Sequence, residues 1–340
     1  MTGALLKSSL WHTEYLNPFI VFQHGITQII LSRKTRFQDM LIVRTGAYGK
    51  ALILDGKLQV AVEDEFFYHE PLVHVPAVLH GSPRSVLVLG GGDGCTIREV
   101  LKWNSVERVV LVDIDEEVVR ACEEFLPELH QGAFQDPRLK CFFEDGLKFI
   151  DKCNEKFDLI ISDLTDPLED GPSFFLFTEE FFRKVKTLLN LGGIFVTQAA
   201  SVSLPEEPLH PRIVKTLSKV YSHVDSIHSF IGSYGSPIGF AMASDKPLET
   251  DLSRPHIEEI LYSHVNRDSL KLLDGRSFQG FVGTPLILRR AIEKETISYS
   301  EQHVPKAFGG QHVEHAEYVI VCTSDQGDMN ILPSFYCYPT

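Results

Sequence analysis

A short apolar run passes directly into a glycine-rich turn at Val86-Leu87-Val88-Leu89-Gly90-Gly91-Gly92-Asp93-Gly94. Four consecutive apolar residues are typical of a strand that is buried on both faces. A helical pattern of apolar residues begins at Thr96, immediately after the turn. Because glycine has no Cβ atom, a turn of this kind between a strand and a helix lets a ligand approach the backbone closely. The stretch predicts the first strand, turn and helix of a sheet that binds a nucleoside or nucleotide.

Strand-like and helical patterns alternate through the rest of this part of the chain. The strand-like segments are 85–89, 108–112, 139–143, 157–162, 194–198 and 238–244. The helical segments are 96–103, 116–126, 178–189 and 211–221, and Thr178 is the predicted N-cap of the third. Such alternation is typical of a parallel sheet covered by helices on both faces. We therefore predict an α/β fold with a doubly wound, Rossmann-like sheet of the methyltransferase type.

The N-terminal part has a different character. Short alternating runs occupy 27–32, 39–45, 51–54 and 58–62. Asp55-Gly56 lies between the last two runs, and this dipeptide favours a tight hairpin turn because both residues tolerate positive φ angles. The predicted domains are a small antiparallel β domain at 1–80, the Rossmann-like domain at 81–300, and a segment at 301–340 whose role the sequence leaves open.

The composition excludes several classes of function. No apolar run approaches the roughly 18 residues that a membrane span requires, and the N-terminal residues lack the features of a secretory signal. The net charge of −14 disfavours binding to nucleic acid, which needs a basic surface, and favours the approach of cationic ligands. The six cysteines form no C-x-x-C pair, so we expect free thiols and no metal site. The expectation is a cytoplasmic protein without membrane or nucleic-acid partners.

A second strand end supplies a carboxylate for the nucleoside. The strand at 108–112 ends at Asp113, about 20 residues after the glycine turn, where a carboxylate can accept hydrogen bonds from both ribose hydroxyls. Asp145 follows the next strand and can accept a hydrogen bond from the adenine amino group; the alternative is an ordinary solvated charge. NAD enzymes and methyltransferases share the glycine turn, so these residues indicate an adenosine-type ligand and leave the reaction open.

Two aspartates follow the buried strand at 157–162. Asp163 and Asp166 lie three residues apart, and Pro167 ends regular structure after them. Both carboxylates can face the same crevice at the sheet edge, which suits a cationic substrate. An alkylammonium with a pKa of about 10.4 must be bound as a cation and then deprotonated before it can act as a nucleophile. The alternative is that Asp163 only caps the following turn.

The segment after this pair is unusually apolar. Residues 168–177 contain Phe174, Phe175 and Phe177 together with a Gly-Pro pair. We predict that the segment is a lid, which covers the substrate and excludes water. The alternative is that the phenylalanines pack beneath the loop.

The chain resembles the polyamine aminopropyltransferases, the family of the spermidine and thermospermine synthases. The motifs that carry the resemblance are Phe37-Gln38-Asp39, Leu54-Asp55-Gly56, Glu63-x-Glu65-Phe66, Tyr68-His69-Glu70, Gly90 to Gly94, Asp113-Ile114-Asp115, Asp145-Gly146 and Asp163-x-x-Asp166-Pro167. The resemblance implies a β-stranded N-terminal unit, a Rossmann-like catalytic domain, and decarboxylated S-adenosylmethionine as the donor co-substrate, with no separate cofactor. It also implies a homodimer or homotetramer.

The resemblance implies a role for each matching position. The donor-binding positions are Gln38, Gly90, Gly92, Asp93, Asp113, Glu144, Asp145 and Gly146. The acceptor-binding positions are His69, Asp166, Gln198 and Tyr234. Tyr68 and Asp163 resemble the catalytic pair that positions and deprotonates the attacking amine. Asp93 and Asp163 resemble the ligands of the aminopropyl ammonium, and intact S-adenosylmethionine would bring its own carboxylate toward Asp93, so repulsion between like charges excludes it.

The sequence departs from ordinary spermidine synthases at two places. Leu164-Thr165 stands where those enzymes usually have two serines, and the stretch around Tyr234 is one residue shorter. Both features are more similar to thermospermine synthases and to triamine/agmatine aminopropyltransferases, so the expected acceptor is spermidine, which would give thermospermine. Putrescine and agmatine are the alternative acceptors. The rival functions are a small-amine N-methyltransferase, a non-catalytic polyamine-binding protein and an NAD dehydrogenase, for which the chain has no nicotinamide-specific feature.

Overall fold

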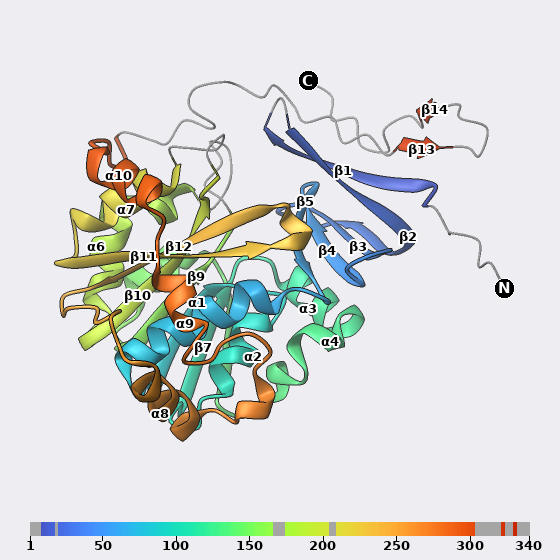
Figure 1. Ribbon diagram of the computed structural model, residues 1–340. Coiled ribbons are helices and arrows are strands. Elements are labelled where there is room, and N and C mark those ends of the chain that lie inside the picture. Colours follow the sequence, from blue (N-terminus) through green and yellow to red (C-terminus); the bar gives the residue numbers. More distant parts are fainter. Residues whose placement is uncertain are drawn as a thin grey trace. The chain divides into compact units, whose positions relative to one another are not determined.

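The computed structural model describes residues 8–17, 20–165, 174–203, 209–302, 321–323 and 329–331 (Figure 1). The chain divides into two compact units. The first comprises the described residues of Met1–Asp64, Gly232–Gly235 and His312–Thr340, and the second those of Glu65–Ile231 and Ser236–Gln311. The second unit begins at Glu65, so residues 65–80, which the predicted boundary placed in the N-terminal domain, belong to the unit that carries the parallel sheet.

The first unit is built on an antiparallel sheet. Its strands are β1 (Leu10–Asn17), β2 (Ile20–Lys34), β3 (Asp39–Thr45), β4 (Lys50–Leu54), β5 (Lys57–Ala61), β13 (Val321–Thr323) and β14 (Met329–Ile331), in the order β14-β13-β1-β2-β3-β4-β5. The tight turn predicted at Asp55-Gly56 joins β4 to β5, with φ angles of 46° and 71°. Buried apolar side chains such as Val43 and Ile53 form the core of this unit.

The second unit contains the predicted α/β sheet. Its strands are β6 (Ser85–Gly90), β7 (Arg108–Asp113), β8 (Leu139–Phe143), β9 (Phe157–Asp163), β10 (Leu189–Ser201), β11 (His223–Ile231) and β12 (Ser236–Ser244). Their order is β11-β12-β10-β9-β6-β7-β8; the last five are parallel to one another, β12 runs antiparallel to them, and β11, which pairs antiparallel with β12, runs in the same direction as the five. The six predicted strands are all present, and this order, with one antiparallel strand next to the edge, is that of the methyltransferase-like fold.

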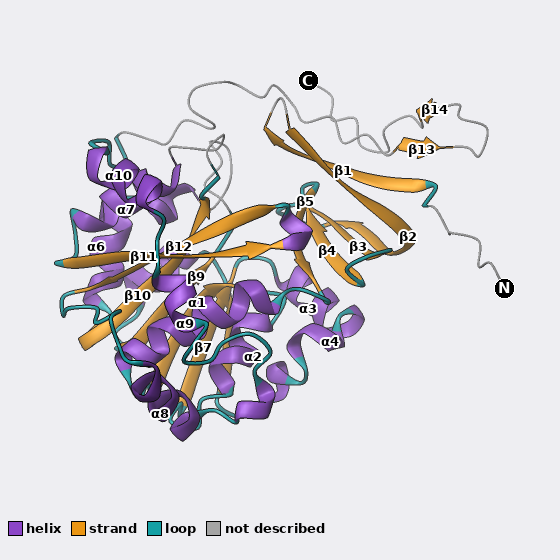
Figure 2. Cartoon of the chain, viewed as in Figure 1, coloured by secondary structure: helices purple, strands orange, loops and turns teal. Residues whose placement is uncertain are grey.

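Helices cover both faces of this sheet (Figure 2). They are α1 (Phe66–His80), α2 (Cys95–Leu101), α3 (Glu116–Phe125), α4 (Pro127–His130), α5 (Gly146–Lys152), α6 (Glu179–Thr187), α7 (Leu209–Ser218), α8 (Arg254–His264), α9 (Phe278–Val282) and α10 (Leu286–Lys294), with short 3-10 turns at η1 (Ala133–Gln135), η2 (Phe174–Phe177), η4 (Gly232–Tyr234) and η5 (Arg267–Ser269). One layer joins α1 to α2, α8 and α9, and the other joins α5, α6, α7 and α10. As predicted, Thr178 caps α6 and accepts a hydrogen bond from the Phe181 N–H. Within the described residues, no helix is both long and apolar enough to cross a membrane.

Several elements of the second unit were not predicted, namely the helices α1, α4, α5, α8, α9 and α10 and strand β11; α1 and β11 lie beside the predicted sheet strands and show why. Helix α1 is buried without interruption from Tyr68 to Val78 and contains Pro71 and Pro76, so its sequence has neither an apolar stripe nor an unbroken run of helix-forming residues. Strand β11 is rich in polar residues, two of which, Ser226 and Ser229, are buried while Phe230 is exposed, and it pairs with β12 at the edge of the sheet. Both elements form because of tertiary packing, which local periodicity does not record.

The order of the strands reverses between β6 and β9, and the site lies at this point. Gly90 at the end of β6 pairs with Asp163 at the end of β9, and the Gly91 N–H donates to the Asp163 carbonyl oxygen at 2.9 Å. Gly90 has a φ of 76°, and a Cβ atom at this position would lie only 2.2 Å from the same carbonyl oxygen. Glycine is therefore required here on two grounds. Open α/β sheets bind their ligands at such reversals, outside the carboxyl ends of the strands.

Candidate functional site

Three carboxylates meet at the carboxyl edge of the second sheet. Asp93 lies in the glycine turn after β6, Asp113 ends β7, and Asp163 ends β9. These strands are neighbours and run parallel, so their carboxyl ends face the same side of the sheet. The structure thus brings together three of the aspartates that the sequence analysis selected.

Asp113 is held against the glycine turn. A Cβ atom at Gly92 would lie 2.7 Å from Asp113 Oδ2, so the turn can approach this carboxylate only because glycine stands there. Asp113 Oδ1 accepts a hydrogen bond from the Asp115 N–H at 2.8 Å. Burial raises the pKa of Asp113 to about 6, and the charges of Asp115, Asp93 and Asp163 add to this effect, while the hydrogen bond opposes it.

Asp163 accepts two side-chain hydrogen bonds from different elements. Tyr68 Oη in α1 donates to Asp163 Oδ1 at 2.7 Å, and Thr96 Oγ1 in α2 donates to Oδ2 at 2.5 Å. The ring of Tyr68 packs edge-on against Phe240 of β12, with ring centroids 5.0 Å apart. Burial raises the pKa of Asp163, and the charge of Asp93 raises it further, against the opposing effects of His69 and the two hydrogen bonds. A carboxylate with a raised pKa that is oriented on both oxygens is well suited to accept a proton.

His69 lies next to this pair on the buried helix α1. Its Nδ1 is 2.8 Å from the carbonyl oxygen of Glu65 and 3.1 Å from Glu65 Oε2, and its Nε2 is 4.0 Å from Asp93 Oδ1. Burial lowers the pKa of His69, but the hydrogen bond to Glu65 and the charges of Asp93, Glu65 and Asp163 outweigh burial and raise the pKa to about 9. The site therefore contains a histidine that is cationic at neutral pH.

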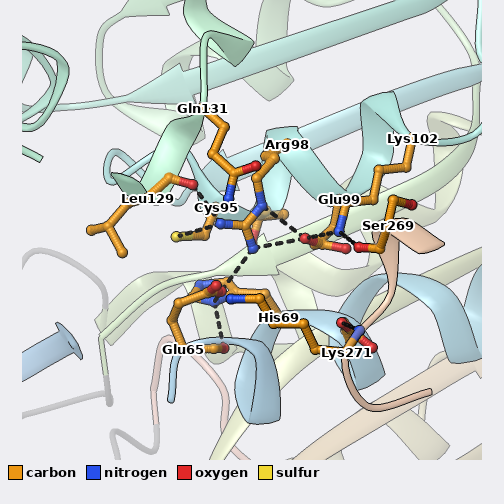
Figure 3. A network of polar contacts seen from close by, with 12 residues as sticks. Glu65, His69, Cys95, Arg98, Glu99, Lys102, Leu129, Gln131, Ser269 and Lys271 are labelled. Atoms are coloured by element: carbon orange, nitrogen blue, oxygen red, sulfur yellow. Dashed lines mark hydrogen bonds and ion pairs between the residues drawn. The ribbon is translucent and has the colours of Figure 1, made fainter. Parts of the chain in front are cut away.

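A buried arginine stands behind His69 (Figure 3). Arg98 donates to Glu65 Oε2 at 2.7 Å, to Glu99 Oε1 at 2.8 Å, and to the carbonyl oxygen of Leu129. Glu65, His69 and Cys95 also bring three groups of metal-ligand type within 4.8 Å of one another. Arg98 already bonds to two of these three, since its guanidinium contacts Cys95 Sγ at 3.8 Å as well as Glu65. The positive charge that this cluster requires is thus supplied by the protein.

The other predicted positions of the second unit lie at the same sheet edge or just beyond it. Asp145 caps α5 by accepting from the Leu147 N–H at 2.8 Å, and Gly146 is the first residue of that helix. Glu144 pairs with Lys152 at 2.6 Å. Gln198 follows Thr197, which pairs with Ser162, so Gln198 is level with the end of β9. Their contacts with substrate remain predictions.

Two predicted positions belong to the first unit, and a third is not among the described residues. Gln38 belongs to the first unit, in the turn between β2 and β3, where its N–H donates to Thr35 Oγ1 at 3.1 Å. Tyr234 also belongs to the first unit; its hydroxyl donates to the Gln59 carbonyl oxygen, and its ring packs against the core of that unit. Asp166 lies outside the described residues, as does most of the predicted lid. At the end of that segment Phe177 is buried in the core.

Sequence reasoning gave no role to Thr96, Glu65 or Arg98, although Glu65 stands in one of the motifs that carry the family resemblance. Thr96 follows the glycine turn by two residues and resembles an ordinary first-turn residue of a helix. Glu65 and His69 are four residues apart, which places them on one helix face, but α1 itself was not predicted. Arg98 offered a clearer signal, because it is a charged residue in a short helix that directly follows a buried strand and turn.

We predict that Asp113→Asn stabilises the protein at pH 8. The raised native pKa of Asp113 means that the ionised carboxylate destabilises the folded state above pH 6, and that this effect fades as the pH falls through 6 toward 4. The amide keeps the oxygen that accepts from Asp115. We expect the melting temperature to rise by about 2–4 °C at pH 8, by about half as much at pH 5, and to differ little from the wild type below pH 4.

Asp158→Asn is the control, and for this variant we expect the opposite change in stability. Burial raises the pKa of Asp158, but hydrogen bonds from Asn190 and from the N–H groups of Arg84 and Ser85 outweigh burial and lower it. This variant should be less stable than the wild type at pH 8, and the difference should shrink in acid. A loss of stability in Asp113→Asn at pH 8 would contradict the electrostatic account of the site.

Comparison with known proteins identifies the family. The spermine/spermidine synthase domain matches residues 65–253, and the spermidine synthase tetramerisation domain matches residues 10–61. A polyamine aminopropyltransferase of Synechococcus sp. (strain JA-3-3Ab) is 46% identical over 88% of this chain and 98% of its own, and one of Aeropyrum pernix is 44% identical over 84% and 91%. The crystal structure of a spermidine synthase in complex with the transition-state analogue AdoDATO is 28% identical, covers 85% of this chain and 97% of its own, and has a TM-score of 0.78. The chain belongs to the spermine/spermidine synthase family of polyamine aminopropyltransferases.

Proposed function

We propose that this enzyme transfers the aminopropyl group of decarboxylated S-adenosylmethionine to an amine of spermidine and releases methylthioadenosine. One observation carries the proposal: the Asp163 carboxylate accepts a hydrogen bond from Tyr68 at 2.7 Å and is close enough to Asp93 for the two charges to interact. Two carboxylates at the reversal point of a nucleoside-type sheet suit a donor that ends in an ammonium group. They also repel a methyl donor that retains its amino-acid carboxylate.

In this proposal, two different sets of residues bind the two ends of the donor. The glycine turn and Asp113 bind the ribose, and Glu144, Asp145 and Gly146 bind the adenine end; the family resemblance adds Gln38 as a predicted donor contact. Asp93 and Asp163 bind the ammonium at the other end of the donor. The hydrogen-bonded position of Asp113 beside Gly92 supports the ribose contact.

The transfer requires one proton acceptor. The nitrogen of the deprotonated acceptor amine attacks the methylene carbon attached to the donor sulfonium, the new C–N bond forms, and the C–S bond breaks with its electron pair remaining on sulfur. The sulfur leaves as a neutral thioether, so the step needs no metal ion and no further cofactor. Asp163 accepts the proton of the attacking ammonium, and Tyr68 keeps the Asp163 carboxylate oriented.

Spermidine is the proposed acceptor, which makes thermospermine the proposed product. His69 and Gln198 form the acceptor side of the site in this proposal, and the family resemblance adds Asp166 and Tyr234 as predicted acceptor contacts. Leu164 packs against the core of the second unit, so the leucine does not by itself enlarge an acceptor site. The support for spermidine is therefore the resemblance around Tyr234 and the phenylalanine-rich segment that follows Asp166.

The proposed partner of the chain is a further copy of itself. The match of residues 10–61 to a tetramerisation domain supports a homo-oligomer formed through the antiparallel sheet of the first unit. Light scattering on the purified protein measures the number of copies directly.

We predict that Asp163→Asn lowers kcat about 10²–10⁴ fold, because the variant keeps the shape of the site and loses its proton acceptor. The control is Asp158→Asn, a change of the same chemistry at the opposite end of β9, where the carboxylate binds backbone N–H groups away from the glycine turn. The control should keep kcat within about twofold of the wild type when it is assayed below its melting temperature. Near-normal kcat in Asp163→Asn would remove Asp163 from the mechanism.

We predict that spermidine is used with a higher kcat/KM than putrescine, by about tenfold or more. A triamine offers additional methylene groups, each contributing about 0.8 kcal/mol when buried, and a second ammonium for the acidic residues. The measurement is kcat/KM for putrescine, spermidine, agmatine and norspermidine under one set of conditions, with identification of each product. A preference for putrescine would contradict spermidine as the acceptor and would make the enzyme a spermidine synthase, while the proposed donor would be unaffected.

A further inference from the structure

Arg98 is a buried cation whose partners lie on two sides. Its side chain is 7% exposed, and it binds one carboxylate toward the site, that of Glu65, and one on the other side, that of Glu99 (Figure 3). A buried guanidinium is unfavourable unless its donors are satisfied, and the Leu129 carbonyl oxygen accepts a further bond. These partners thus hold the Arg98 guanidinium in one position, and the guanidinium in turn holds the Glu65 and Glu99 carboxylates in theirs.

Glu65 connects this arginine to His69. Its Oε2 accepts from Arg98 at 2.7 Å and from His69 Nδ1 at 3.1 Å, and its carbonyl oxygen lies 2.8 Å from the same Nδ1. A carbonyl oxygen can only accept a hydrogen bond, so Nδ1 must carry a proton in either charge state of the ring. The only nitrogen of His69 that can gain or lose a proton is therefore Nε2, which is the nitrogen nearest Asp93.

The charges around His69 come from three further elements. Among the described residues, the ionisable groups around it include Glu65 at the start of α1, the neighbouring Tyr68 with its ring centroid 4.8 Å away, Asp93 in the glycine turn, Cys95 and Arg98 in α2, and Asp163 at the end of β9. Asp93 and Asp163 are the two groups that the proposed function assigns to the donor ammonium. Any cation bound there lies on the Nε2 side of His69, while Glu65 and Arg98 act on the Nδ1 side.

We infer that Arg98 and Glu65 are positioning residues of this site: Arg98 holds the Glu65 carboxylate, and Glu65 keeps a proton on His69 Nδ1 so that Nε2 is directed at Asp93. The consequence is that Nε2 alone responds to the charge beside Asp93. When a substrate ammonium occupies that place, the proton on Nε2 loses its stabilising partner and can leave. This consequence rests on the proposed function, whereas the arrangement of the ring does not.

Glu99 supplies a matched control for Glu65. It is the second carboxylate on the same guanidinium and is completely buried, yet it leads away from the site, to Lys102 at 2.7 Å and to His74 at 2.8 Å. Glu65→Gln and Glu99→Gln each remove one buried negative charge from Arg98. A purely structural role predicts similar consequences for both, and a positioning role predicts that only Glu65→Gln alters His69.

The decisive experiment is a pH titration of ¹⁵N-histidine in the full-length protein by NMR, with the His69 signals assigned by their absence in His69→Gln. In the wild type we expect neutral His69 to carry its proton on Nδ1. We expect the midpoint of its titration to fall by about one pH unit or more in Glu65→Gln, since a negative charge is lost. In Glu99→Gln the midpoint should stay within about 0.3 units of the wild type.

Two results would overturn the inference. One is a neutral His69 with its proton on Nε2 in the wild type, a measurement that needs no folded variant of Glu65 or Glu99. The other is an equal shift of the midpoint in the two glutamine variants. The pH profile of kcat/KM is the kinetic measurement. The inflection of this profile that reflects the titration of His69 should move to lower pH in Glu65→Gln and should not move in Glu99→Gln. If the protein transfers no aminopropyl group, the kinetic measurement fails while the NMR result still decides the positions of the protons.

Discussion

Asp93, Asp113 and Asp163 share one edge of the second sheet because parallel neighbouring strands deliver all three to it. Burial and mutual repulsion raise the pKa of Asp113 and Asp163, so the protein alone holds this negative charge at a free-energy cost. The remaining features of the site follow from that constraint. A ligand that brings positive charge therefore lowers the free energy of such a site most, and an aminopropyl donor ends in an ammonium group.

The second unit balances these acids with cations of its own. His69 faces Asp93 from the buried helix α1, and Arg98 bridges two carboxylates behind it. Both cations are held by α1 and α2, which contact each other on one face of the sheet. The continuous burial of α1 thus also serves the site, because the buried helix holds Tyr68 and His69 in fixed positions at the sheet edge. Strain and charge that reduce stability at a site are commonly retained where binding requires them.

The sequence predicted the sheet well because each of its central strands has a local signature. Apolar runs such as 86–89 and 157–162 are buried strands, and their ends place Gly90 and Asp163 side by side. The hydrogen bond between Tyr68 and Asp163 could not be derived in this way, since 95 residues separate the two and α1 has no amphipathic period. Their pairing came from the family resemblance. Arg98 was missed because its significance depends on three partners that only the folded chain brings together.

The central claim is that the acidic sheet edge selects a donor without an amino-acid carboxylate. Calorimetric titration of the wild-type protein with decarboxylated S-adenosylmethionine and with S-adenosylmethionine, in the same buffer at pH 7.5, tests this claim most directly. The two ligands share the nucleoside and the sulfonium and differ only in the carboxylate that would approach Asp93. We expect the decarboxylated donor to bind at least about tenfold more tightly, a difference of about 1.4 kcal/mol or more. Equal or tighter binding of S-adenosylmethionine would contradict the account.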